Sequence, residues 1–247
     1  MPSLHPSVQV DPTCVLGHHV VIEENVEIGQ HCKIGHFVVL RSGTRLGNHV
    51  QIGDHSVLGQ QPMRTANSAV TNDTKKTGPH VSDRVRIGSH SIIYAGCTLS
   101  EDVFVADLAT IREDVQVGQK TIVGRGVAIE NQCSIGSYCK LETNAYITAY
   151  STIEDRVFVA PGVLTSNDNF IGRTEERFKH FKGAILREGS RVGVGAVILP
   201  GVELPSEAVL AAAAVLTKTG EPGVIHKGLP AKPSGPVPAE QLLSNNK

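Results

Sequence analysis

The sequence predicts an all-β solenoid, a parallel β-helix wound from repeats of six residues. Three observations support this prediction. An aliphatic side chain recurs at every sixth position along most of the chain, and a small or β-branched side chain usually stands two positions before it. Aromatic residues make up only 4% of the 247 residues, and tryptophan is absent. Six residues are too few for a helical repeat, but they suffice for a short strand and a turn.

The aliphatic positions fall into three runs with one spacing, at residues 4–58, 81–159 and 186–216, which together hold thirty repeats. Alternate residues of a strand point to the same face, so the aliphatic residue and the small residue before it both face the interior. Glycine often follows the aliphatic residue, where it permits a tight corner. We therefore predict a β-helix domain over residues 1–220.

All five cysteines stand in the small inward position: Cys14, Cys32, Cys97, Cys133 and Cys139. Their spacing matches none of the familiar zinc motifs. We interpret them as core residues, in preference to nucleophiles, metal ligands or disulfide partners. Most histidines fall at coil corners and are interpreted as solvent-exposed turn residues.

Function is expected where the repeat breaks, because insertions in solenoids tend to gather on one face. The first insertion, about 59–80, is polar and contains prolines and a glycine that favour an exposed loop. The second, about 161–184, holds three of the six phenylalanines. Either these rings seal the loop against the solenoid, or the loop crosses a subunit boundary and walls a ligand site. Residues 221–247 are predicted to form a closing segment and tail.

Composition argues against several partners. The formal net charge is −1, from 23 Lys and Arg against 24 Asp and Glu, which leaves no basic excess for nucleic acid or anionic lipid. No run of about 18 apolar residues is present, and the first residues lack a basic region followed by an apolar core. We expect a cytoplasmic protein with neither nucleic-acid nor membrane partners.

The phased hexads resemble those of the left-handed β-helix acyltransferases, over roughly residues 4–220. In that family three hexads form one triangular coil, so the resemblance implies a left-handed parallel β-helix of about ten coils. It also implies acetyl-CoA or another short acyl-CoA as co-substrate, no metal ion, and a homotrimer with its sites between neighbouring prisms.

Residues 110–173 resemble one branch of that family, the enzymes that N-acylate a nucleotide-linked amino sugar such as a dTDP-linked 3-amino-3,6-dideoxyhexose. The segment SNDNFIGR, at residues 166–173, carries most of this resemblance. The acceptor implied is the amine of a dTDP- or UDP-linked sugar. A sugar O-acetyltransferase is the alternative, and a γ-carbonic anhydrase-like enzyme or a structural β-helix are more distant ones. His31 and His36 have a suitable metal-ligand spacing, but no third histidine is in phase with them.

A coil of three hexads places residues 18 apart on the same corner, which makes Glu113 and Asn131 direct neighbours. We predict them as the catalytic pair, facing a neighbouring subunit and gripping the acceptor amine. Beside them, Arg112 and Glu130 occupy the corner position that is usually glycine. The alternative is an exposed polar ladder with one weak surface ion pair.

Other candidate residues come mainly from the resemblance. The predicted substrate-binding residues are Asn167, Asn169, Arg173, Glu142 and Asn144, and His180 is an alternative base. The predicted CoA contacts are Lys232, in the segment GLPAK that resembles the closing segment of these enzymes, with Ala196 and Ala214. In the expected reaction the amine attacks the thioester directly, and backbone N–H groups stabilise the oxyanion.

Overall fold

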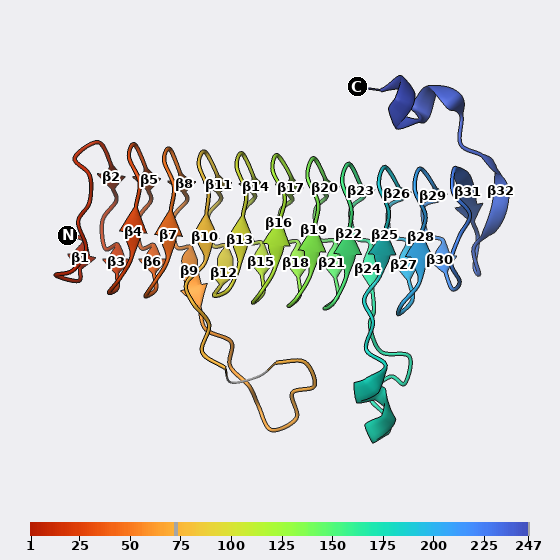
Figure 1. Ribbon diagram of the computed structural model, residues 1–247, viewed down its shortest axis with the longest axis horizontal. Helices are drawn as coiled ribbons and strands as arrows, with labels where there is room; N and C mark the ends of the chain where they lie inside the picture. Colours follow the sequence, from red (N-terminus) through yellow and green to blue (C-terminus); the bar gives the residue numbers. More distant parts are fainter. Residues whose placement is uncertain (72–73, 247) are drawn as a thin grey trace.

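The computed structural model describes residues 1–71 and 74–246, which form an elongated solenoid of short strands (Figure 1). Successive strands alternate among three sheets, which we call sheets 1, 2 and 3 in the order in which the chain visits them. Within the described residues these sheets hold 11, 9 and 12 strands. The predicted all-β parallel β-helix is confirmed, with about twelve coils in place of the predicted ten.

The strands of sheet 1 are β1 (Ser3–Leu4), β3 (Val21–Ile22), β6 (Val39–Leu40), β9 (Val57–Gln60), β12 (Ile92–Tyr94), β15 (Thr110–Ile111), β18 (Ala128–Ile129), β21 (Tyr146–Ile147), β24 (Leu164–Thr165), β27 (Val197–Ile198) and β30 (Val215–Leu216). Those of sheet 2 are β4 (Glu27–Ile28), β7 (Arg45–Leu46), β10 (His80–Val81), β13 (Thr98–Leu99), β16 (Gln116–Val117), β19 (Ser134–Ile135), β22 (Thr152–Ile153), β25 (Ile185–Leu186) and β28 (Glu203–Leu204). Those of sheet 3 are β2 (Val15–Leu16), β5 (Lys33–Ile34), β8 (Gln51–Ile52), β11 (Arg86–Ile87), β14 (Phe104–Val105), β17 (Ile122–Val123), β20 (Lys140–Leu141), β23 (Phe158–Val159), β26 (Arg191–Val192), β29 (Val209–Leu210), β31 (Val224–Lys227) and β32 (Lys232–Pro236).

Strand pairing confirms three hexads per coil. Thr110 pairs with Ala128, and Ala128 pairs with Tyr146, each 18 residues further on. Strand β24 is not part of the predicted pattern, because its inward residue is Thr165, which is polar but only 5% exposed. Strand β31 adds a further level to sheet 3 beyond the last predicted repeat.

The interior is a narrow column of aliphatic and small side chains, among them the fully buried Ile93, Ile111 and Ile129. All five cysteines are free; Cys14 is partly buried and the other four are buried, as the core interpretation predicts. Burial raises the pKa of Cys97 and Cys133 to about 12. These thiols are therefore protonated and unsuited to nucleophilic chemistry near neutral pH.

Both insertions leave the solenoid at the same corner, between sheets 1 and 2, which we call the 1–2 corner. The first connects β9 to β10, and the second connects β24 to β25 and contains the short 3-10 helix η1 (Glu175–Lys179). Figure 1 shows both on the same side of the solenoid. The second insertion begins after Thr165, a few residues later than predicted, because β24 continues the coil.

Residues after 220 close the end of the solenoid. Strand β31 joins sheet 3 beside β29, and β32 folds back antiparallel to β31. Two short 3-10 helices follow, η2 (Ala239–Gln241) and η3 (Leu243–Asn245), and the Gln241 Oε1 accepts a hydrogen bond of 2.9 Å from Arg191 Nη1 of β26. Among the described residues, no helix is long and apolar enough to cross a membrane.

Candidate functional site

Four coils of the 1–2 corner lie between the two insertions. At this corner the residues 18 apart are Ala95, Glu113, Asn131 and Ala149, and all four are at most 3% exposed. Asn131 and Glu113 therefore share one corner, as the coil period predicts. Both lie buried, so they form neither an exposed ladder nor an open surface.

Arg112 is the centre of the charged groups at this corner. Its Nε donates to Glu113 Oε2 at 2.8 Å and its Nη2 donates to Glu113 Oε1 at 3.2 Å, while Glu130 Oε2 lies 3.6 Å from its Nη1. The guanidinium also stacks over Tyr94, 4.7 Å from the ring centre. Two-point pairing of this kind holds both partners in a defined geometry. Both carboxylate oxygens of Glu113 are thus occupied by Arg112.

The first insertion folds over these residues. Asn131 Nδ2 donates to the Val70 carbonyl at 3.2 Å, and Arg112 Nη2 donates to Thr71 Oγ1 at 3.2 Å. The ion pair of Lys76 with Asp114, 2.7 Å, anchors the returning part of the insertion. Asn131 Oδ1 is buried without a hydrogen-bond partner among the described residues.

A cavity of about 180 Å³ lies between the two insertions. Its walls include Val70 of the first insertion, Asn167, Asp168 and Arg177 of the second, and Glu130 and Tyr146 of the intervening coils. The polar groups around this space are the carboxylates of Glu130 and Asp168, the amide of Asn167 and the guanidinium of Arg177. The arrangement suits a ligand that carries an amine or hydroxyl group.

Asp168 organises the second insertion. It accepts hydrogen bonds from the Phe170 and Gly172 amides at 2.8 and 2.9 Å and pairs with Arg177 at 3.1 Å. Desolvation acts to raise the pKa of Asp168, but these amides and the guanidinium outweigh it and hold that pKa below its usual value. Arg177 also lies over the rings of Phe178 and Phe181. The clustered rings thus pack around a cation within the loop.

Glu130 is one of two cavity carboxylates, with Asp168, that are not among the predicted site residues. Burial raises its pKa; Arg112 opposes that shift and Glu113 adds to it. The sequence held one signal for this residue, since it fills a corner position usually taken by glycine. Perturbed carboxylates in cavities are frequent functional groups.

The structure brings only some of the predicted residues together. Asn167 lines the cavity, and Glu113 and Asn131 lie beneath the first insertion beside it. The exposed Asn169 and Arg173 do not line the cavity, and the exposed His180 pairs with Glu176 at 3.1 Å.

The remaining candidates lie elsewhere. Glu142 and Asn144 occupy the corner between sheets 3 and 1, away from the 1–2 corner. Ala196 and Ala214 are fully buried in the core, so their side chains cannot contact CoA and only their backbones could. Lys232 is exposed on β32.

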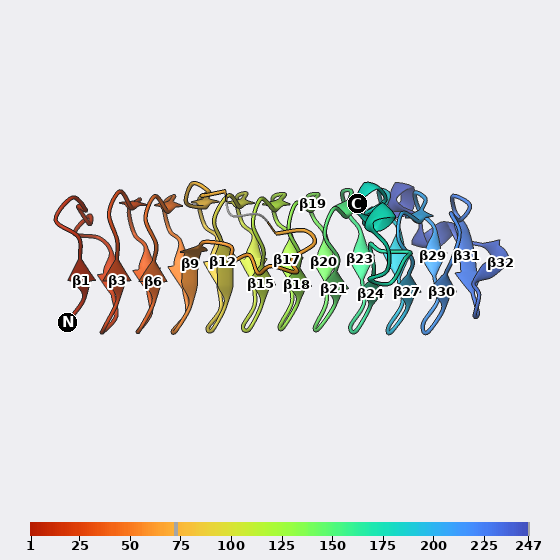
Figure 2. The same cartoon turned by 90° about the horizontal axis from the view of Figure 1, so that it is seen from below.

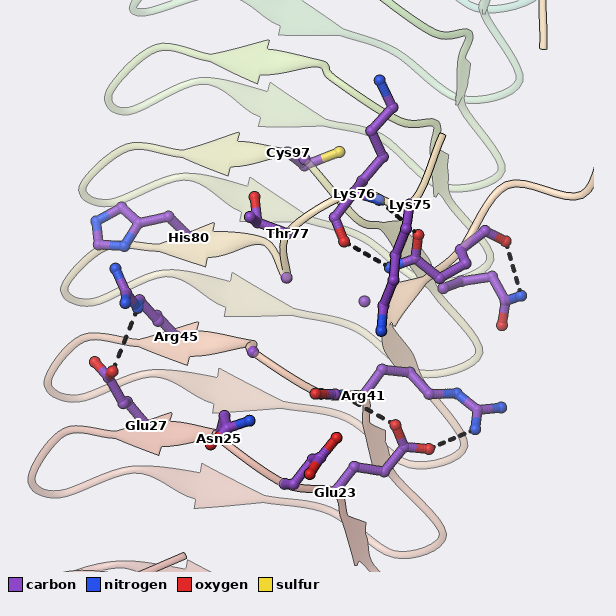
Figure 3. Close-up of a pocket in the computed structure, with 18 of the residues that line it drawn as sticks. Glu23, Asn25, Glu27, Arg41, Arg45, Lys75, Lys76, Thr77, His80 and Cys97 are labelled. Atoms are coloured by element: carbon purple, nitrogen blue, oxygen red, sulfur yellow. Dashed lines mark hydrogen bonds and ion pairs between the residues drawn. The ribbon is translucent and has the colours of Figure 1, made fainter. Parts of the chain in front are cut away.

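A larger cavity of about 1190 Å³ lies on the N-terminal side of the first insertion (Figure 3). Ion pairs line it, Arg41 with Glu23 at 2.6 Å and Arg45 with Glu27 at 3.4 Å. Lys75 is drawn beside them in Figure 3 on the returning part of the insertion. This cavity contains none of the predicted site residues. Its lining holds carboxylates as well as cations, so it shows no excess of positive charge for a phosphate.

Across the described residues, no group of three or more His, Cys, Asp or Glu side chains is placed to hold a metal ion.

Two protein-family models match the sequence. The bacterial transferase hexapeptide (six repeats) matches residues 25–60, and the hexapeptide repeat of succinyl-transferase matches residues 186–218. The matched repeats are those of transferases. No curated protein sequence matches the chain significantly.

Several solved structures are similar to this chain at low identity. LpxA from Acinetobacter baumannii is 16% identical over 94% of this chain and 74% of its own, with a TM-score of 0.48. UDP-N-acetylglucosamine acyltransferase from Campylobacter jejuni is 15% identical over 95% and 75%, with a TM-score of 0.45. A GDP-perosamine N-acetyltransferase from Caulobacter crescentus, solved with CoA and GDP-perosamine, is 20% identical over 64% and 53%, with a TM-score of 0.31. Similarity this distant says nothing about the substrate of this chain.

Proposed function

We propose that the protein is an acyl-CoA-dependent N-acyltransferase, which transfers an acetyl or other short acyl group to the amine of a nucleotide-linked amino sugar. The hexapeptide transferase repeats support the reaction class. One observation carries the location of the site: Glu130 and Asn167 line one cavity at the corner from which both insertions leave. Asp168 lines it too, but its oxygens are engaged by the Phe170 and Gly172 amides and by Arg177, so Glu130 is the carboxylate that we propose accepts an N–H bond from the ligand.

In the proposed reaction the neutral amine attacks the thioester carbonyl, a C–N bond forms, and CoA leaves as the thiolate. Glu130 accepts a hydrogen bond from the amine and takes the proton that it loses. Asn167 orients the sugar, and backbone N–H groups hold the oxyanion. Because an unprotonated amine is already a good nucleophile, much of the rate comes from orientation and exclusion of water.

Glu113 is proposed to act through Arg112. The two-point contact with Glu113 fixes the guanidinium, and the guanidinium in turn lies 3.6 Å from Glu130. The predicted direct grip by Glu113 and Asn131 would require the first insertion to lift, because Val70 and Thr71 bond to Asn131 and Arg112. Glu113 is therefore proposed as a positioning residue.

The acyl donor is proposed to be CoA-linked, with the exposed Lys232 as one phosphate contact, and the assembly is proposed to be a homotrimer. Donor groups that differ by one methylene differ by only about 1–3 kcal/mol in a pocket, so the acyl group must be measured.

The test of the reaction is mass spectrometry of the products from a panel of dTDP- and UDP-linked amino sugars with acetyl-CoA and longer acyl-CoAs. We expect a mass increase of one acyl group on the amino sugars and none on the matching hydroxyl sugars. Acylation of only the hydroxyl sugars would establish an O-acetyltransferase in its place. No acyl transfer to any member of the panel would contradict the proposal.

Glu130→Gln tests the site. The amide cannot take a proton, so we expect kcat/KM to fall by about 10²-fold or more, with an unchanged melting temperature. Glu101→Gln is the control, because Glu101 is exposed at another corner and pairs with Arg84. If Glu130→Gln has wild-type kinetics, Glu130 is not the base.

The pH dependence of kcat/KM distinguishes the proposed role of Glu130, as the base, from that of Glu113, as a positioning residue. Glu130 must be ionised to act, and its pKa is raised, so kcat/KM should begin to fall at a higher pH than an ordinary carboxylate, about 4.3, would give. The negative charge of Glu113 contributes to that raised pKa, so Glu113→Gln should shift this limb to lower pH. The limb should vanish in Glu130→Gln, while the limb from the amine itself remains. If the acidic limb of the kcat/KM profile stays at its wild-type pH in both Glu130→Gln and Glu113→Gln, Glu130 is not the base and Glu113 does not influence it.

A further inference from the structure

Strand β24 breaks the repeat of sheet 1 next to the cavity between the two insertions. Figure 2 shows it in line with the other strands of that sheet, between β21 and β27. Among the described strands of sheet 1, Thr165 is the one polar residue in the inward position. The others are leucine or isoleucine: Leu4, Ile22, Leu40, Leu58, Ile93, Ile111, Ile129, Ile147, Ile198 and Leu216. A buried hydroxyl in such a column needs hydrogen-bond partners, because burying it unpaired is costly.

The Thr165 hydroxyl takes a place in the ladder that a backbone carbonyl fills elsewhere. In the preceding coil, the N–H of Glu130 donates to the Ile147 carbonyl at 2.9 Å. The equivalent N–H one coil later, that of Thr148, donates instead to Thr165 Oγ1 at 2.7 Å. The same hydroxyl donates to the Tyr146 carbonyl at 3.1 Å. As a result β21 and β24 share one residue pair in register, whereas β18 and β21, and β24 and β27, share two.

Thr148 lines the cavity, and buried side chains bond to both of its backbone polar groups. Its carbonyl accepts a hydrogen bond from Ser151 Oγ at 2.7 Å, and Ser151 Oγ in turn accepts one from the Ala184 N–H at 3.2 Å. Ala184 immediately precedes β25 and so ends the second insertion, whereas Thr165 immediately precedes that insertion. Each end of the second insertion is therefore tied to Thr148 by one buried hydroxyl.

We propose that Thr165 is a positioning residue, which sets the second insertion against the coil that forms the opposite wall of the cavity. Asn167 and Asp168 follow Thr165 by two and three residues and line the cavity from the insertion, whereas Tyr146 and Thr148 line it from the preceding coil. One hydroxyl thus fixes the two walls relative to each other. The consequence for catalysis rests on the function proposed above; the consequence for the path of the insertion does not.

The repeat itself favours an aliphatic residue at position 165. Valine has nearly the shape of threonine, and the carbonyl of residue 165 can accept from the Thr148 N–H once the two coils pair as their neighbours do. We therefore expect Thr165→Val to fold with a regular ladder and a displaced insertion. A residue that breaks a local rule beside a cavity is typical of a functional site.

Hydrogen exchange tests the placement of the insertion, with Thr121→Val as the matched control for Thr165→Val. Thr121 is fully buried between sheets 2 and 3, and its hydroxyl likewise donates to a carbonyl, that of Gly136 at 2.7 Å, and accepts from an N–H, that of Cys139 at 3.0 Å. We expect peptides from residues 166–184 to exchange at least tenfold faster in Thr165→Val than in the wild type and in Thr121→Val. Thr165→Ser keeps the hydroxyl and should exchange as the wild type does.

Ser151→Ala is a second variant, which removes the tie at the other end of the insertion. Alanine occupies the equivalent small inward position at Ala145, so this chain is expected to fold. It should also speed exchange in residues 166–184, and it keeps the test open if Thr165→Val does not fold.

Steady-state kinetics test the consequence for the reaction. A displaced insertion misplaces Asn167, so the KM for the amino sugar should rise at least tenfold in Thr165→Val, whereas the KM for acyl-CoA stays unchanged. Thr165→Ser should restore the wild-type KM, and Thr121→Val should leave it unchanged. General destabilisation would not raise the KM for one substrate alone.

Wild-type exchange of residues 166–184 in both Thr165→Val and Ser151→Ala would overturn the proposal. Faster exchange together with a wild-type KM for the amino sugar would overturn the role of Thr165 in the reaction. A wild-type protein that transfers no acyl group would contradict the proposed function, while the exchange measurement, made without substrate, would still decide whether Thr165 places the insertion.

Discussion

At the scale of single residues, the small inward position does more than fill space. Each of its five cysteines, and also Ser91 and Thr121, donates to a corner carbonyl 15 residues further on. Cys97 Sγ donates to the Arg112 carbonyl at 2.9 Å, and Thr121 Oγ1 donates to the Gly136 carbonyl at 2.7 Å. Corner carbonyls cannot all join the ladders between strands, and a buried carbonyl without a donor is costly. This explains why polar small residues share the position with alanine and valine.

Replacement of Cys97 tests this role. Cys97→Ser keeps a donor, whereas Cys97→Val fills similar space and leaves the Arg112 carbonyl unpaired. We expect Cys97→Val to lose about 1–3 kcal/mol of unfolding free energy relative to Cys97→Ser in urea titrations. Equal stability of the two variants would show that the position selects for volume alone.

The buried thiols also predict a pH dependence. Burial raises the folded-state pKa of Cys97 and Cys133 to about 12, and of Cys32 and Cys139 to about 11, above the ordinary thiol value near 9. Above that ordinary value the unfolded chain loses thiol protons that the folded chain keeps. The contribution of these thiols to the free energy of unfolding is therefore fully present below about pH 9, and the free energy of unfolding should decline from pH 9 to 11. A variant with serine at these four positions should decline less; an identical decline would contradict the assignment.

At the scale of elements, corner rings form a stacked column. His19 stacks on Phe37, Phe37 on His55, and His55 on His90, with ring centres 4.8–4.9 Å apart. The predicted turn histidines are exposed, and they also join successive coils along the axis. Each such contact contributes about 0.5–1.5 kcal/mol.

Phe37→Ala interrupts this column at its centre. It removes two ring contacts, so we expect a loss of about 1–3 kcal/mol of unfolding free energy. Phe104→Ala is the control, because Phe104 is similarly exposed, 41% against 48% for Phe37, and makes no ring contact within the part of the chain that the structure describes. Equal losses in chemical denaturation would mean that the column contributes nothing beyond ordinary burial.

The hexad predicts the coil because one spacing repeats wherever the interior admits only aliphatic side chains. It fails at Thr165, where a polar residue takes an inward position and bonds to the backbone of the neighbouring coil. The period also predicts that Glu113 and Asn131 are neighbours. It does not predict their burial, because the first insertion has no repeat and its contacts with Arg112 and Asn131 depend on its folded path. Glu130 was missed for the same reason.

At the scale of the whole molecule, a solenoid must end its sheets and cover its core. Each coil stacks only on its neighbours, so the last coil would expose both its interior and the strand edges of its sheets. Here β31 pairs with β29, β32 turns back along β31, and the buried His226 sits in β31. The segment after 220 therefore acts as the cap of the solenoid.

Truncation tests this cap. A chain that ends at Gly220 lacks β31 and β32, which leaves β29 as an open edge beside the core residues Leu210 and Leu216. We expect it to form large aggregates in light scattering and to melt at a lower temperature. A chain that ends at Pro238 is the control, because it keeps β31, β32 and the bond from the Val237 amide to the Gly223 carbonyl, 2.8 Å. If the chain ending at Gly220 aggregates no more than this control and melts at the same temperature, the segment after 220 is not required as a cap.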